Sequence, residues 1–169
     1  MYIITLILLL FWSLLGSFDS TYYHEKKYSL HLHNESIKEH LYHTIRAICY
    51  PIIIFSLFYK NFTGIIYWIG ITAVIIDTIF FILDAFEEKN SRNKWNGLSH
   101  GEYITHLFSN TFHYCAIVVI LLSKFFLSEQ IDHPLYLSII SIIFIIGGTI
   151  TAIQHILKFY KFKQNNSIL

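Results

Sequence analysis

Charged side chains are scarce in this chain. Asp, Glu, Lys and Arg make up 14% of its 169 residues, whereas soluble domains have about a quarter. Hydrophobic residues make up 54%, and the mean hydropathy is +0.51. This composition excludes a soluble globular domain and predicts an integral membrane protein. At roughly 20 apolar residues per crossing, the chain has room for about four to six spans and for no separate catalytic domain.

Cysteine is scarce as well, and so is clustered positive charge. The two cysteines, Cys49 and Cys115, lie singly in apolar runs. Without a Cys-x-x-Cys pair, neither a thiol redox motif nor a zinc knuckle is available. The formal net charge is +1, and the Lys and Arg residues form only short groups beside apolar runs. We therefore exclude a nucleic-acid partner.

Long apolar segments are what the chain has instead. They predict an all-α fold, a polytopic bundle of about five transmembrane helices in a single domain, residues 1–169. Pro51 lies inside the second segment and predicts a kinked helix. The first segment is a span or a signal peptide, but it lacks the basic region that precedes a signal peptide's apolar stretch. The segments are 2–18, 41–59, 62–86, 103–127 and 135–157.

The distribution of Lys and Arg predicts the orientation, because short loops rich in these residues stay in the cytoplasm. Of the twelve Lys and Arg residues, only Lys60 and Lys124 lie on the predicted outer side. We expect the amino terminus outside and the carboxyl terminus in the cytoplasm, in a bacterial inner membrane. The residues on the other side are Lys26, Lys27, Lys38, Arg46, Lys89, Arg92, Lys94, Lys158, Lys161 and Lys163.

Ionisable residues gather in the predicted cytoplasmic half of the bundle. Residues 4, 7 and 11 positions apart share a helix face. Because the third and fourth spans are antiparallel, we expect a carboxylate beside an imidazole at two depths, Asp77 with His113 and Asp84 with His106. The mirrored series are Asp77, Asp84 and Glu88 in the third span and Glu102, His106 and His113 in the fourth. A further polar face contains Glu39, His43 and Arg46.

These residues predict a metal site. An unpaired carboxylate in lipid costs several kcal/mol, and helical bundles build two-metal centres from inward-facing carboxylates and imidazoles. Such mixed ligands suit iron or manganese, whereas zinc favours a compact set of four. Iron, as a pair of ions, is the favoured cofactor; zinc, manganese and haem b are alternatives. The candidate metal ligands are Asp77, Asp84, His106, His113, His155, Glu39 and His43.

Structural roles compete with ligation for some of these residues. Ser36 with Glu39, and Ser99 with Glu102, match the capping box at a helix start, so both glutamates are ligands or caps. The Glu-x-x-His pair of soluble two-iron bundles is missing. Arg92 could hold a lipid phosphate. Residues expected to support the ligands or contact headgroups are Glu88, Glu102, Arg46 and Arg92. Residues expected at the surface are His24, His31, His33, His40 and His100.

Three functional hypotheses follow. The first is a metal-dependent membrane enzyme, a di-iron oxidoreductase that acts on a lipid or other hydrophobic substrate at the cytoplasmic leaflet, with a redox partner. The second is a zinc hydrolase of lipid amide or ester bonds. The third is not an enzyme but a b-type haem subunit or a structural subunit of a membrane complex. No catalytic residue is singled out, and membrane lipids are the expected surroundings.

Overall fold

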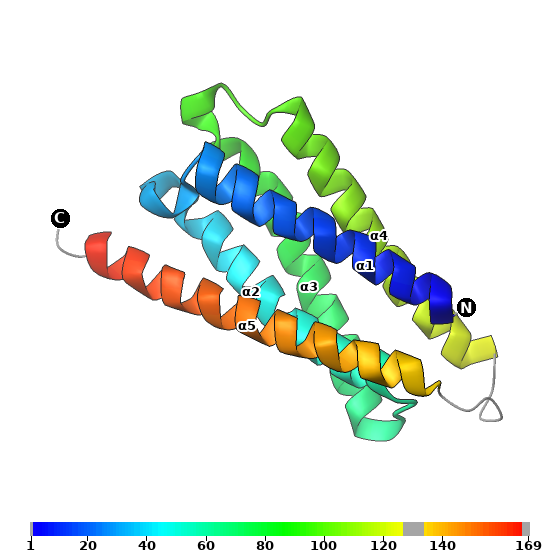
Figure 1. Ribbon diagram of the computed structural model, residues 1–169. Coiled ribbons are helices and arrows are strands. Elements are labelled where there is room, and N and C mark those ends of the chain that lie inside the picture. The colour runs from blue at the N-terminus through cyan, green and yellow to red at the C-terminus, as the bar shows by residue number, and fades with distance from the viewer. Residues whose placement is uncertain (1, 127–133, 167–169) are drawn as a thin grey trace.

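The computed structural model describes residues 2–126 and 134–166, and within these residues it is helical, without strands. Five of its helical segments are long and apolar enough to cross a membrane, which confirms the all-α, five-helix prediction and indicates an integral membrane protein. The side on which each terminus lies stays a prediction. The long helices are α1 (Tyr2–Phe18), α2 (Ile37–Ile53), α3 (Gly64–Ser91), α4 (His100–Phe126) and α5 (Leu135–Asn166) (Figure 1).

Two helices continue with wider winding. After Phe18 the chain goes on as the π-helix η1 (Asp19–Lys27), so the first helical segment extends nine residues beyond its predicted end at residue 18. Helix α2 contains Pro51 and continues from Ile54 as the π-helix η4 (Ile54–Tyr59). A proline removes one backbone donor from the helix, which is consistent with altered winding after it. The short 3-10 turns are η2 (Leu30–Leu32), η3 (Asn34–Ser36) and η5 (Asn93–Trp95).

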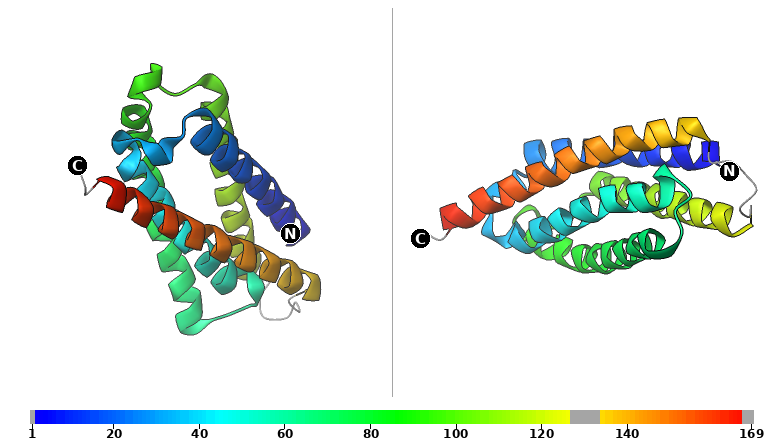
Figure 2. Two further views of the ribbon diagram at one scale, coloured as in Figure 1. Left: turned by 60° about the vertical axis from the view of Figure 1, so that its left-hand side comes forward. Right: turned by 90° about the horizontal axis from the view of Figure 1, so that it is seen from below.

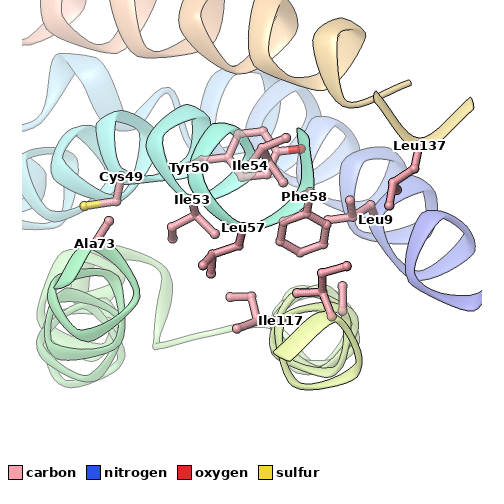
Figure 3. Close-up of a cluster of buried hydrophobic side chains, with 12 residues drawn as sticks. Leu9, Cys49, Tyr50, Ile53, Ile54, Leu57, Phe58, Ala73, Ile117 and Leu137 are labelled. Carbon is pink, nitrogen blue, oxygen red and sulfur yellow. The ribbon is translucent and has the colours of Figure 1, made fainter. Parts of the chain in front are cut away.

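The helices pack in two sets. Helix α1 lies along α4, whereas α2 lies along both α3 and α5 (Figures 1 and 2). At the end of the bundle where α1 begins, the two sets share an apolar core. Figure 3 shows Leu9 of α1, Phe58 of η4 and Ile117 of α4 in this core, and all three are buried. The outward faces are also apolar, as at Phe86, which is 76% exposed. Such faces are suited to lipid.

Helices α2 and α5 approach closely at Gly148. A Cβ atom added there would lie 2.5 Å from Cδ1 of the buried Tyr50, whereas one added at Gly147 would meet nothing within 4 Å. Alanine favours a helix over glycine by about 1 kcal/mol, but overpacking costs about 1–3 kcal/mol. We therefore expect Gly148→Ala to melt about 5 °C below the matched variant Gly147→Ala in detergent. Equal melting temperatures would contradict this packing.

Candidate metal centre

The half of the bundle opposite the apolar core holds a connected cluster of ionisable side chains with an excess of acid. In the part of the chain that the structure describes, six carboxylates and two guanidiniums belong to it, which leaves four negative charges if the histidines are neutral. The members are Asp19, Glu39, Asp77, Asp84, Glu88 and Glu102 with Arg46 and Arg92, joined through His24, His43, His106 and His113. Burying uncompensated charge is costly, so this excess calls for cations.

A first group that could hold a metal ion contains Asp19, His24 and His106. Nε2 of His24 lies 3.3 Å from one Asp19 oxygen, and Nε2 of His106 lies 2.9 Å from the other. Asp19 and His24 are five residues apart in η1, and a π-helix stacks residues at that separation on one face. In an α-helix their side chains would diverge. The π winding is therefore what brings both toward His106 of α4.

Glu88 lies close to the imidazole of His106 on the far side from Asp19. Its Oε1 atom lies 2.8 Å from Nδ1 of His106, while Nε2 faces Asp19. Metal-bound histidines commonly donate their other ring N–H to a carboxylate, which fixes the tautomer and strengthens the ligand. Glu88 on α3 thus stands where a supporting carboxylate would stand if Nε2 of His106 bound an ion.

A second group contains His24, Glu39 and His43. Oε1 of Glu39 lies 3.9 Å from Nε2 of His24 and 3.6 Å from Nε2 of His43. Oδ2 of Asp84 also approaches Nε2 of His43, at 3.4 Å. The other oxygen of Asp84 is buried and accepts no hydrogen bond from the described residues. A buried carboxylate oxygen without a donor is costly, and a cation would satisfy it.

The spacing of these atoms is compatible with ligation. Nitrogen and oxygen ligands lie about 2.1 Å from an ion such as zinc, so two ligands of one ion lie about 3–4 Å apart. The nitrogen–oxygen separations given above for both groups, from 2.9 to 3.9 Å, fall close to this range. Nε2 of His24 has a single lone pair and binds one ion. A second ion would then have Glu39 and His43 as ligands, with Asp84 close to His43 although it belongs to neither three-residue group.

Arg92 binds both glutamates that the capping boxes involve. It is fully buried and forms a bidentate pair with Glu39, at 2.7 and 3.0 Å, and two bonds to Glu102, at 2.9 and 2.6 Å. A further N–H donates to Ser91, so all five N–H groups point at protein acceptors and none at a headgroup. Burial disfavours the charge, but the carboxylates outweigh it and raise the pKa of Arg92 above its ordinary value.

The capping boxes form only in part. Ser99 accepts a hydrogen bond from the backbone N–H of Glu102 at 3.4 Å and so caps α4. Ser36 forms no side-chain cap; its hydroxyl donates to the carbonyl oxygens of Leu30 and His33. Neither glutamate side chain returns to its serine's backbone, because Arg92 competes for both carboxylates.

A deeper layer joins α2, α3 and α4 around Asp77. The structure confirms that Asp77 and His113 meet, with Nε2 of His113 3.2 Å from Oδ2. Tyr114 donates to the same oxygen at 2.9 Å, and Arg46 donates to Oδ1 at 3.2 Å. Arg46 also bonds to Asn110 at 2.7 Å. Asp77 is thus satisfied by protein donors, and within the described residues neither it nor His113 belongs to a three-residue metal group.

The expected pair of Asp84 with His106 is replaced by other partners. His106 contacts Asp19 and Glu88, whereas Asp84 contacts His43 and Arg46. The reason is that α1 and its π-helical continuation pack along α4 and supply the carboxylate from a third direction. His155 lies on α5 beside His40, with ring centroids 5.5 Å apart, and 6.5 Å from the ring of His43. It borders the cluster without joining either group.

Sequence reasoning missed Asp19 and His24 as ligand candidates. His24 was expected at the surface, but its side chain is only 15% exposed, and the ring lies 4.8 Å from that of His43. The five-residue spacing does not match an α-helical face, so periodicity gave no sign of the pair. The position of both residues directly after an apolar run was the available signal.

A large cavity adjoins the cluster. It has a volume of about 810 Å³ and is lined by residues of α1, η1, α2, α3, α4 and α5. Asp19, His24, His43, Asp84 and His106 lie on its wall. Sites for small molecules commonly occupy about 300–1,000 Å³. The candidate ligands are therefore accessible to a substrate of substantial size.

Comparisons of this chain with protein-family models, with curated proteins and with solved structures found no match.

Proposed function

We propose that this protein is a metal-dependent membrane enzyme, an oxidoreductase that uses a pair of iron ions on a hydrophobic substrate. One ion would be held by Asp19, His24 and His106. The other would be held by Glu39 and His43 with Asp84. The observation that carries the proposal is the buried excess of four negative charges around these imidazoles, which two divalent cations would balance.

Protons are the rival source of positive charge. Four protonated histidines, His24, His43, His106 and His113, would also neutralise the cluster. Two features favour metal over protons. The donor atoms of two groups converge to within 4.8 Å of one another, and the carboxylate of Glu88 stands behind His106 as a supporting group does behind a metal-bound imidazole.

The ligand types favour iron or manganese over zinc. Both groups mix carboxylate with imidazole and contain no thiolate, and such sets suit iron with open positions for a reactant. A pair of iron ions held there would supply oxidation chemistry with dioxygen as the oxidant. In a hydroxylation, one oxygen atom enters a C–H bond of the substrate and the other leaves as water, with two electrons and two protons supplied by an external reductant.

Metal analysis of the purified protein tests the proposal. We expect about two iron ions per chain, as the charge excess requires. His106→Ala and His43→Ala should each remove about one ion, since each deletes a ligand of one group. His100→Ala is the matched control, because His100 is exposed at the start of α4. An absorption spectrum of the same samples identifies haem.

The outcomes separate the alternatives. Two irons with magnetic coupling support the proposal. Zinc without iron would overturn the oxidoreductase and leave the hydrolase, and a haem spectrum would replace both. Protein free of metal and stable at neutral pH would favour protonated histidines. His113→Ala tests whether the deeper layer around Asp77 binds metal. Loss of metal in this variant would identify that layer as a binding site.

A further inference from the structure

The cavity beside the candidate metal centre has two kinds of wall. Its polar wall carries the ionisable residues of η1, α2, α3 and α4 described above. Its other wall comes from α1 and α5. This wall is apolar at Trp12, Ile143, Phe144, Gly147 and Gly148, and polar at Ser13, Ser17, Thr151, Gln154, His155 and Lys158. An apolar molecule lying along α5 would therefore place one end at the imidazoles. This arrangement suits an amphiphile better than a compact polar substrate.

The charges that line the cavity decide which headgroup fits. Arg46 and Lys158 are the cations among the described residues of the lining. Arg46 is bound by Asp77 and Asn110, and Lys158 is paired with Glu25. Each cation is therefore already paired within the protein. With two divalent ions bound, the cluster itself is balanced, so a substrate charge of either sign would be buried without a partner.

From these observations we infer that the substrate is an uncharged, long-chain molecule dissolved in the membrane, such as a fatty alcohol, an isoprenoid or a hydrocarbon. This inference rests on the proposed function for the charge balance. The apolar part lies against α1 and α5, and the reacting end reaches the imidazoles. Gly147 keeps the path along α5 open, since a Cβ atom there would meet nothing within 4 Å.

Quenching of Trp12 fluorescence tests the inference. Trp12 lines the cavity, packed on Tyr50 at 4.3 Å and His113 at 5.1 Å between ring centroids. Trp68→Phe and Trp95→Phe would leave it as the single tryptophan, since the chain has three. The probes are 9,10-dibromooctadecanol and its sulfate ester, which share one chain and differ in charge. Each is titrated into metal-loaded protein in detergent, and metal content is measured in the same samples.

We expect saturable quenching by the alcohol and at least about tenfold weaker apparent affinity for the sulfate. Gly147→Leu fills the path along α5. This variant should lower the apparent affinity for the alcohol by about tenfold and should retain the metal. Thr149→Leu is the matched control, because Thr149 is exposed and does not line the cavity.

Equal affinity for alcohol and sulfate would overturn the assignment of an uncharged substrate. Quenching that rises linearly with probe concentration, and that is the same in Gly147→Leu as in the wild type, would overturn the cavity as the binding site. The metal measurement keeps the two proposals apart. Bound metal without saturable quenching defeats only the substrate inference, whereas saturable quenching of metal-free protein defeats the proposed metal centre.

Discussion

Replacement of Arg92 by methionine should lower the melting temperature in detergent by roughly 10 °C. Arg92 is fully buried between Glu39 and Glu102. Each hydrogen bond from its guanidinium to these carboxylates is shorter than 3.1 Å. Removing one partner of a buried ion pair costs about 3–5 kcal/mol, because the remaining charge stays buried. In a domain of this size, 1 kcal/mol corresponds to about 2–4 °C.

Two companion variants identify the cause. Lys94→Met removes another cation from the same turn, but Lys94 pairs with Glu35 in an exposed position, so its melting temperature should match the wild type. Adding Glu102→Gln to Arg92→Met removes one of the stranded carboxylates and should recover part of the loss. If the single Arg92→Met variant melts at the wild-type temperature, the ion pairs of Arg92 with Glu39 and Glu102 do not stabilise the fold.

Replacement of His24 by alanine should reduce the metal content from about two ions per chain to about one. His24 is one of the three proposed ligands of the first ion, so its loss leaves that ion with only Asp19 and His106. The change creates no unpaired buried carboxylate, because Asp19 keeps His106 and Glu39 keeps Arg92. We therefore expect the helical circular dichroism spectrum to persist while metal, measured by mass spectrometry, is lost.

The control for His24→Ala lies in the same connection between the first two spans. His33 packs against Trp95, with ring centroids 5.1 Å apart, and belongs to neither candidate group. His33→Ala should therefore keep the full metal content. Retention of two ions in His24→Ala would remove Asp19, His24 and His106 as a metal site and leave hydrogen bonding as the account of these residues.

The helices could be predicted from the sequence because lipid imposes a simple rule: a spanning segment is long and apolar. The contact of Asp77 with His113 followed from equal depth on antiparallel helices. The partners of Asp84 and His106 did not follow, since depth alone cannot say which helices are neighbours. Here α1 packs along α4 and carries Asp19 to His106.

Local winding and competition among acceptors account for the other differences. No periodic pattern in residues 19–27 predicts a π-helix, so His24 was expected at the surface. The role of Arg92 was equally hidden, because its two glutamates lie 53 and 10 residues away in the chain. Arg92, Glu39 and Glu102 pair because all three are buried together, and this burial depends on the assembled bundle.

The two-set packing of the helices gives the candidate centre a mechanical meaning. Asp19, His24 and His106 all belong to the α1 and α4 set, whereas Glu39, His43 and Asp84 all belong to the set built on α2 and α3. Each set thus brings its own negatively charged half-site to the boundary between them. Without cations the two halves carry charge of the same sign and repel each other across that boundary, and one divalent ion bound in each half would remove this repulsion. Metal binding would therefore stabilise the contact between the two helix sets.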